Sequence, residues 1–218
     1  MKPTESRETL TVLDDGACPL YRPEIAHAQG LTSYLERELR SDHAGETGAV
    51  HIYRGISAVA ARRGDQELLA FAQRHEKTET EHLRLVETWL PQSRRSRLLG
   101  PWRLAGWLTG VLPALAGRRA VYATIAAVET FVDRHYQQQI DHLHQHPGPD
   151  GLLDLLVRCQ SDERHHRDEA QALAGREVPL LLRVWCALVG VGSAAALRSS
   201  NCSRQRLSLI FDSHHVSS

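Results

Sequence analysis

Four long segments of the chain repeat hydrophobic residues every three to four positions, the spacing that places them on one face of an α-helix. Strand signals are nearly absent, because alternating runs of valine, isoleucine and threonine do not occur. Glycine and proline residues separate the periodic segments. The pattern predicts helices near residues 32–62, 66–90, 119–145, 151–174 and 179–197.

The four long helices pair into two hairpins, which form a faint internal repeat, and the apolar segment 101–117 joins them. Two helical hairpins joined by a long crossover build a ferritin-like bundle. We therefore expect an all-α fold: a ferritin-like four-helix bundle with an amphipathic crossover segment and a fifth C-terminal helix. The expected divisions are an irregular segment 1–25, a domain over 26–197 and a serine-rich mobile tail over 198–218.

Composition narrows the class of protein. The 218 residues carry 26 Lys and Arg and 26 Asp and Glu, so the formal net charge is zero. This balance argues against nucleic-acid binding, which usually needs a basic excess, and against general disorder. The four cysteines form no CxxC pair, and the N-terminus has no apolar signal-peptide core. We expect reduced thiols in a bacterial cytosolic protein.

Two apolar stretches, 104–116 and 178–197, bear on membrane contact. The first is too short to span a bilayer and the second contains Arg183. Tryptophans flanked by arginines in both stretches suit a membrane interface. The alternative, that both are core helices, stays open at this point.

A glutamate interrupts the middle of each long apolar stripe. These four residues are Glu46, Glu79, Glu129 and Glu163. In the second and fourth helices the glutamate opens a Glu-x-x-His pair, which ends at His82 and His166 respectively. Residues at i and i+3 share one face of a helix, so each pair points in one direction.

Four carboxylates in one bundle core would repel each other and would each cost several kcal/mol to desolvate. No Lys or Arg lies on these stripes to neutralise them, whereas two divalent metal ions would. Each Glu-x-x-His pair starts 33 or 34 residues after the preceding glutamate, as expected for facing helices of a hairpin. This is the di-iron carboxylate arrangement. The predicted metal ligands, which are also the predicted catalytic residues, are Glu46, Glu79, His82, Glu129, Glu163 and His166.

Other acidic and histidine residues nearby are expected to lie outside the site. Glu76 and Glu81 are predicted to face solvent. The histidines expected on the surface are His51, His142, His144 and His146. A competing pair, Asp162 with His165, differs from the chosen pair by one position, and it stays open on the sequence alone.

The segment from Arg40 to Glu46 reads R-S-D-H-A-G-E and resembles the R-x-D-H-A-G-E signature of the demethoxyubiquinone hydroxylases. The pairs at Glu79 and Glu163 and the segment 127–136 resemble the family's remaining motifs, over roughly residues 32–197. The resemblance implies a di-iron enzyme that uses O2 to hydroxylate ring C6 of 2-polyprenyl-3-methyl-6-methoxy-1,4-benzoquinol, or its quinone, late in ubiquinone biosynthesis. It implies two iron ions per subunit. The sequence shows no Gly-rich dinucleotide-binding motif, so no nucleotide cofactor site is expected.

The resemblance also implies a location and roles for residues. The substrate's isoprenoid tail implies peripheral contact with the cytoplasmic side of the bacterial inner membrane, and it allows an oligomer and partners from a biosynthetic complex. Glu46 and Glu129 would be terminal carboxylate ligands, whereas Glu79 and Glu163 would bridge the irons. Other expected roles concern two neighbouring pairs. Asp42 and His43 are predicted to support the metal-bound histidines, and His135 and Tyr136 either to relay protons or electrons or to pack.

Two alternatives remain from other functional classes. A ferritin-like or rubrerythrin-like protein would use the same six ligands to oxidise iron or reduce peroxide. A non-enzymatic quinone-binding or lipid-binding component of the biosynthetic complex would keep the metal site only for structure.

Overall fold

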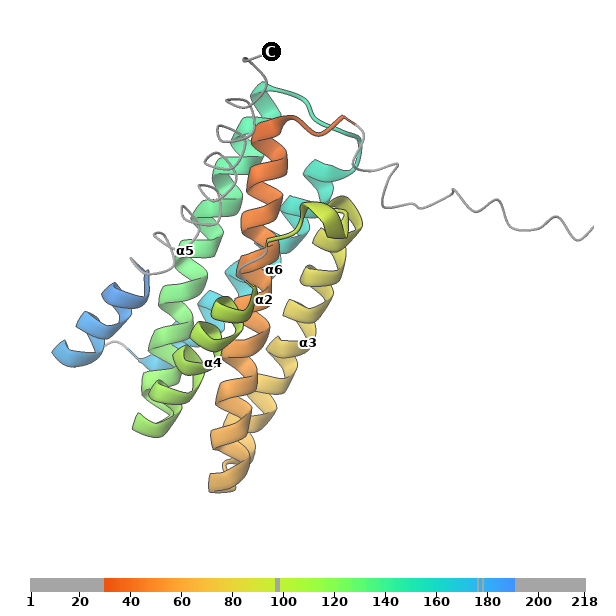
Figure 1. Cartoon of the computed structure of the whole chain (residues 1–218). Helices are drawn as coiled ribbons and strands as arrows, with labels where there is room; N and C mark the ends of the chain where they lie inside the picture. The colour runs from red at the N-terminus through yellow and green to blue at the C-terminus, as the bar shows by residue number, and fades with distance from the viewer. Residues whose placement is uncertain (1–29, 97–98, 176, 178, 191–218) are drawn as a thin grey trace, which may run out of the picture.

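The computed structural model describes residues 30–96, 99–175, 177 and 179–190, and all regular structure within them is helical (Figure 1). The elements are α2 (Ser33–Arg63), α3 (Gln66–Trp89), the 3-10 turn η1 (Gln92–Arg94), α4 (Leu99–Ala116), α5 (Arg118–Gln145) and α6 (Leu152–Ala174). Residues 180–190 form a further helical segment. The all-α prediction is confirmed. The predicted irregular segment 1–25 and tail 198–218 lie outside the described residues.

Local capping sets the turn of the first hairpin. The side chain of Thr32 accepts a hydrogen bond from the Leu35 amide at 3.2 Å and starts α2. Gly64 ends α2 in the left-handed conformation, with φ of 68°, which glycine adopts without strain. Asp65 then caps α3 by accepting from the Leu68 amide at 3.0 Å. The chain therefore reverses within two residues, and α2 and α3 lie antiparallel.

Two hairpins, α2 with α3 and α5 with α6, form the bundle, and α4 crosses between them while packing along α2 and against α5 (Figure 1). Helices pack more closely within each hairpin than between hairpins. The apolar core divides into two clusters, one around Ile56, Phe71 and Ile125 and the other around Leu39 and Trp89. The glutamates of the four stripes lie between these clusters along every long helix, so the bundle has a polar layer at mid-height.

Glycines allow α4 to approach α2 closely. A Cβ atom at Gly106 would overlap the backbone oxygen of Gly48, and one at Gly110 would overlap that of Ile52. The small residues of α4 therefore face α2, while large apolar ones face outward, including Leu104 and Leu112. No helix among the described residues is both long enough and apolar enough to cross a membrane.

Candidate metal centre

All six side chains predicted from the sequence lie in one buried cluster, and none is more than 4% exposed. They form two overlapping groups whose ligand atoms lie within 4.8 Å of one another. The first group is Glu46, Glu79, His82 and Glu163, and the second is Glu79, Glu129, Glu163 and His166. Each group contains three carboxylates and one imidazole, and two glutamates belong to both.

The two imidazoles reach across from one hairpin to the other. His82 Nδ1 lies 3.0 Å from Glu163 Oε1, and His166 Nδ1 lies 3.0 Å from Glu79 Oε1. Each histidine therefore faces the shared glutamate of the opposite hairpin. This mutual arrangement makes the cluster a single layer that both hairpins complete.

Burial and mutual repulsion dominate the electrostatics of the two glutamates that belong to one group each. Burial, with the charges of Glu79 and Glu163, raises the pKa of Glu46 well above its usual value. Burial and the same two charges raise the pKa of Glu129. In the metal-free protein both carboxyl groups therefore keep their protons to a higher pH than an exposed glutamate does.

The pKa values of the two histidines also rise, but here the neighbouring carboxylates act against burial. Burial disfavours the imidazolium, but the hydrogen bond from His82 to Glu163 and the charges of Glu46 and Glu79 raise the pKa of His82 to about 11. The corresponding contacts with Glu163 and Glu79 raise the pKa of His166 to about 9 against the effect of burial. Protons thus balance the carboxylate charge when no metal is bound.

The donor atoms of this layer are better placed to coordinate metal ions than to form hydrogen bonds with one another. Several are buried without a hydrogen bond of good geometry in the described structure: Glu46 Oε2, Glu79 Oε1, Glu163 Oε2 and His166 Nδ1. Buried polar atoms without partners are costly and rare. Four carboxylates with two imidazoles suit ions such as iron, and two divalent ions would neutralise the carboxylate charge. The cluster therefore has the donors and the spacing to hold metal ions.

Two tyrosines support the glutamates of this layer, in a role that the sequence analysis did not predict. The hydroxyl of Tyr136 donates to Glu46 at 2.5 Å, and that of Tyr53 donates to Glu129 at 3.1 Å. Each tyrosine lies seven residues after the glutamate of its own helix, Glu46 or Glu129. That repeated Glu-x6-Tyr spacing is the signal that could have indicated them.

Asp162 and His165 do not form the competing metal pair. His165 is exposed, whereas His166 is buried. Asp162 instead places Oδ2 at 3.1 Å from His82 Nε2, the ring nitrogen that faces away from the carboxylates. A carboxylate at this position is a common support for a metal-bound imidazole.

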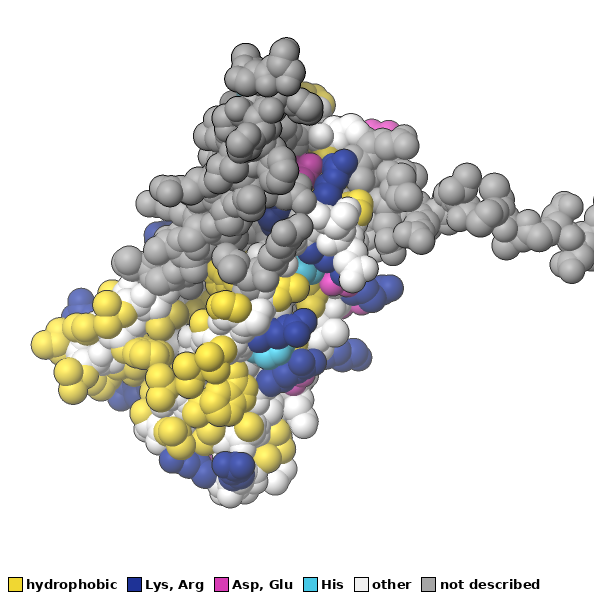
Figure 2. All heavy atoms as spheres, viewed as in Figure 1, with side chains coloured by type: hydrophobic (Ala, Val, Ile, Leu, Met, Phe, Trp, Pro, Cys, Tyr) yellow, Lys and Arg dark blue, Asp and Glu magenta, His cyan; other side chains and the backbone are white. Residues whose placement is uncertain are grey.

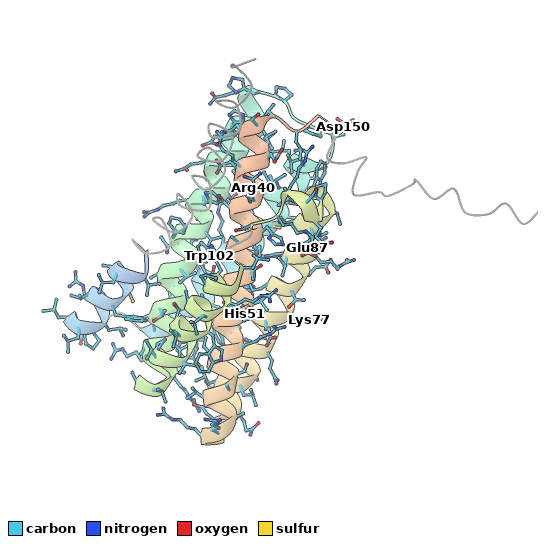
Figure 3. The ribbon with its side chains drawn as sticks, viewed as in Figure 1. Arg40, His51, Lys77, Glu87, Trp102 and Asp150 are labelled. Carbon is cyan, nitrogen blue, oxygen red and sulfur yellow. The ribbon has the colours of Figure 1, made fainter. Side chains whose placement is uncertain are left out.

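The prediction that Asp42 and His43 support the metal-bound histidines was wrong. Asp42 accepts hydrogen bonds from His135 at 2.9 Å and from Gln139 at 2.8 Å, both on α5. His43 lies 3.2 Å from Glu87 of α3, which Figure 3 labels. Both residues lie one turn before Glu46, but the neighbouring helices direct them to other partners.

An apolar cavity of about 380 Å³ opens beside the metal-ligand layer, between α2, α4, α5 and the segment 180–190. All four layer glutamates line it, together with apolar and aromatic side chains such as Trp102, Phe131, Val132 and Trp185. Most ligand cavities combine an apolar wall with a few polar groups in this way. A flat apolar molecule in the cavity would contact the carboxylate layer directly.

Comparison with known proteins now identifies the family. A family profile described as "Ubiquinone biosynthesis protein COQ7" matches residues 33–200. A Rhodospirillum rubrum protein named 3-demethoxyubiquinol 3-hydroxylase is 36% identical over 148 residues, covering 66% of this chain and 68% of that protein. A Dictyostelium discoideum protein named NADPH-dependent 3-demethoxyubiquinone 3-hydroxylase, mitochondrial, is 32% identical over 166 residues, or 75% of each chain. The chain belongs to the COQ7 family of ubiquinone biosynthesis proteins.

Proposed function

We propose that this protein hydroxylates the unsubstituted ring carbon of 2-polyprenyl-3-methyl-6-methoxy-1,4-benzoquinol, using O2 and two iron ions. This carbon is C5 in that name and not C6 as expected from the sequence, because C6 carries the methoxy group. The observation that carries the proposal is that the four carboxylates of the two metal-binding groups also line an apolar cavity. Membership of the COQ7 family and the names of the relatives support the same reaction. In this proposal the two irons lie beside an apolar cavity, and that cavity holds the apolar aromatic ring of the substrate.

The proposed reaction replaces one ring C–H bond by C–OH with one oxygen atom of O2. The other oxygen atom leaves as water, and this step takes up two electrons and two protons. An external reductant supplies the electrons; the Dictyostelium relative is named as NADPH-dependent. The described residues therefore need to hold the metals, position the ring and exclude bulk water.

Each ligand has a distinct role in this proposal. Glu79 and Glu163 belong to both groups and would bridge the irons, while Glu46 and Glu129 would be terminal carboxylates. One histidine, His82 or His166, would complete each position. When bound, the irons supply the redox chemistry that activates O2. Tyr53 and Tyr136 restrain the terminal carboxylates through their hydrogen bonds.

His135 connects the cavity to a buried carboxylate. Its side chain lines the cavity, and Nε2 lies 2.9 Å from Asp42 Oδ1. Burial lowers the tendency of this imidazole to charge, but the hydrogen bond and charge of Asp42 raise the pKa of His135 above its usual value. The pair is therefore placed to hold a proton on Nε2 beside the bound ring.

We also propose that α4 and residues 180–190 contact a membrane surface, on the cytoplasmic side of the bacterial inner membrane. Hydrophobic side chains gather over these segments in Figure 2. The most exposed include Leu104 at 60%, Leu181 at 85% and Leu188 at 64%. Because residues of both segments also line the cavity, a polyprenyl tail in the bilayer would lie close to the cavity wall.

Vesicle flotation tests the membrane proposal. Leu181→Glu is expected to weaken binding of the protein to vesicles of bacterial phospholipid, because it places a charge among exposed apolar side chains. Val157→Glu is the matched control, since Val157 is 46% exposed on α6. Equal flotation of both variants and the unchanged protein would contradict the proposed contact surface.

Metal analysis and turnover together test the proposed reaction. The expected result is about two irons per chain, coupled in Mössbauer spectra, and hydroxylation of a short-chain demethoxyquinol analogue. Many irons per chain without turnover would favour iron storage instead. A folded, metal-free protein that binds the analogue without turnover would favour a non-enzymatic quinone-binding role.

A further inference from the structure

The two metal-binding groups have matched ligands and matched supports. Each contains three carboxylates and one histidine. The terminal glutamate of each group, Glu46 or Glu129, accepts a hydrogen bond from a tyrosine of the opposite hairpin. Any difference between the two positions must therefore arise outside these residues.

The repeat is broken at the residue that precedes each shared glutamate. Asp162 precedes Glu163, and its Oδ2 lies 3.1 Å from His82 Nε2. Thr78 precedes Glu79, and its hydroxyl donates to the Arg74 carbonyl of its own helix at 3.5 Å. One hairpin therefore offers a carboxylate where the other offers a hydroxyl that is turned onto its own helix.

This difference changes what holds each imidazole. His82 has Nδ1 against the carboxylate layer and Nε2 against Asp162. Among the described residues, the carboxylates paired with His166 are those of Glu79 and Glu163, and both lie against Nδ1. The His166 ring also packs edge-on against the His75 ring, with 4.2 Å between their centroids.

His75 does not replace the missing carboxylate. Its Nε2 pairs with Glu169 Oε2 at 3.0 Å, so its own hydrogen-bonding capacity on that side is used. A carboxylate that accepts from the outer nitrogen of a metal-bound imidazole fixes the tautomer and the ring direction and raises ligand basicity. Loss of such a partner typically costs 10–100-fold in metal affinity.

We infer that the two metal positions are unequal, and that the position containing His82 binds its ion more tightly because Asp162 orients that imidazole. The inference rests on the proposed two-metal centre. Asp162 acts as a positioning residue, through His82. No described residue gives His166 such a carboxylate, and the position containing His166 fills second.

The surroundings of Asp162 also differ from those of the apolar cavity. Asp162 and His82 line a polar groove of about 830 Å³ between α3 and α6, with charged residues that include Lys77, Glu81 and Arg158. The side chain of Asp162 is 42% exposed there. Asp162 therefore links the buried His82 ring to a groove of charged and polar side chains that lies apart from the apolar cavity.

Anaerobic titration of the metal-free protein with Fe(II) tests the inference, with calorimetry and chelator competition as readouts. The unchanged protein is expected to bind two ions in two steps that differ about 10–100-fold in affinity. Asp162→Ala should weaken the tighter step by a similar factor and leave the weaker step unchanged. Asp162→Asn, which keeps an acceptor without the charge, should lie between. Glu81→Ala is the matched control, since it removes another carboxylate from the same groove.

Two equal binding steps in the unchanged protein would overturn the inference while leaving the two-metal centre intact. An unchanged tighter step in Asp162→Ala would overturn it as well. Absence of any Fe(II) binding would instead overturn the proposed metal centre, and the inference with it. Absorption bands of Co(II), added as a second probe, should change for the first equivalent in Asp162→Ala and match the unchanged protein in Glu81→Ala.

Discussion

The two seams between the hairpins border the same carboxylate layer but differ in what covers them. The seam between α2 and α5 is covered by α4 and residues 180–190 and contains the apolar cavity. The seam between α3 and α6 has no such cover among the described elements and contains the polar groove, with Lys77 and Arg84 in its wall. The layer of ligands thus has one side that faces the apolar cavity and one side that faces the polar groove.

This difference shows that the hairpin repeat builds the metal-ligand layer, while the crossover and residues 180–190 decide what borders it on one side. The repeated hairpins supply matched donors to both groups. The crossover, with Trp102 and Gly106, and residues 180–190, with Trp185, place an apolar wall over one seam. The apolar cavity then borders the layer on one side, and the groove of charged and polar side chains borders it on the other.

The largest effect is expected from removing a ligand that belongs to both metal-binding groups. Glu163→Ala should abolish binding of both metal ions and reduce hydroxylation to background, because Glu163 belongs to both groups. Elemental analysis and turnover of a short-chain quinol analogue measure the two effects. Glu81→Ala, on the exposed side of α3, should retain both properties. Full activity of Glu163→Ala would refute the metal-centre assignment.

A bulky side chain in the apolar cavity should hinder substrate binding without changing metal binding. Ala49 lines the apolar cavity, so Ala49→Phe is expected to lower kcat/KM at least about tenfold, equivalent to about 1.4 kcal/mol of transition-state binding. Metal content should stay unchanged. Ala61→Phe, at an exposed site of the same helix, serves as control. An unchanged kcat/KM in Ala49→Phe would place the substrate elsewhere.

The metal-free layer should make stability depend on pH. The folded pKa values of His82 and His166, about 11 and about 9, exceed the unfolded value of 6.5, against the effect of burial. Their contribution to stability is therefore present below pH 6.5 and is lost as pH rises through the folded values. Each group contributes at most about 1.4 kcal/mol per pH unit.

The raised pKa values of Glu46 and Glu129, caused first by burial, act in the same direction, since unfolded glutamates ionise near pH 4.5. Chemical denaturation from pH 6.5 to 9 should show falling stability for the metal-free protein. The metal-loaded protein should show a smaller slope, because the ions replace the protons. Equal slopes would contradict this account of charge balance.

The last effect is on stability alone and concerns the contact that holds α4 over the apolar cavity. Gly110→Ala should lower stability by about 1–3 kcal/mol, because the added methyl group would overlap the Ile52 backbone. Gly100→Ala is the control, since a Cβ there meets nothing within 4 Å, and it should be neutral or stabilising by up to about 1 kcal/mol. Thermal melting of both variants measures the difference. An equal melting temperature would show that α4 tolerates a larger separation.

The sequence was informative about the ligand layer because helical periodicity constrains it strongly. A glutamate and a histidine three residues apart share one face of a helix. The nearly equal spacings, 33 residues from Glu46 to Glu79 and 34 from Glu129 to Glu163, then placed all four carboxylates at one height in the bundle. These constraints are local, and they hold for any packing of two facing hairpins.

The partners of Asp42 and His43 were not predictable in the same way. Both residues occupy the turn before Glu46, and periodicity alone directs them toward the bundle interior. Which residue they meet depends on the rotation of α2 against α3 and α5, and the structure directs them to Glu87 and His135. A rotation of a fraction of a turn decides between such partners.

By itself the sequence determined the helical class, the pairing of helices into hairpins and the set of six buried donors around Glu79 and Glu163. Those features follow from periodicity, spacing and the cost of burying unpaired charge. Only the tertiary structure decided that α4 covers one seam, that the tyrosines pair crosswise and that Asp162 supports His82. These depend on distances between helices, which are set by close packing across the whole bundle.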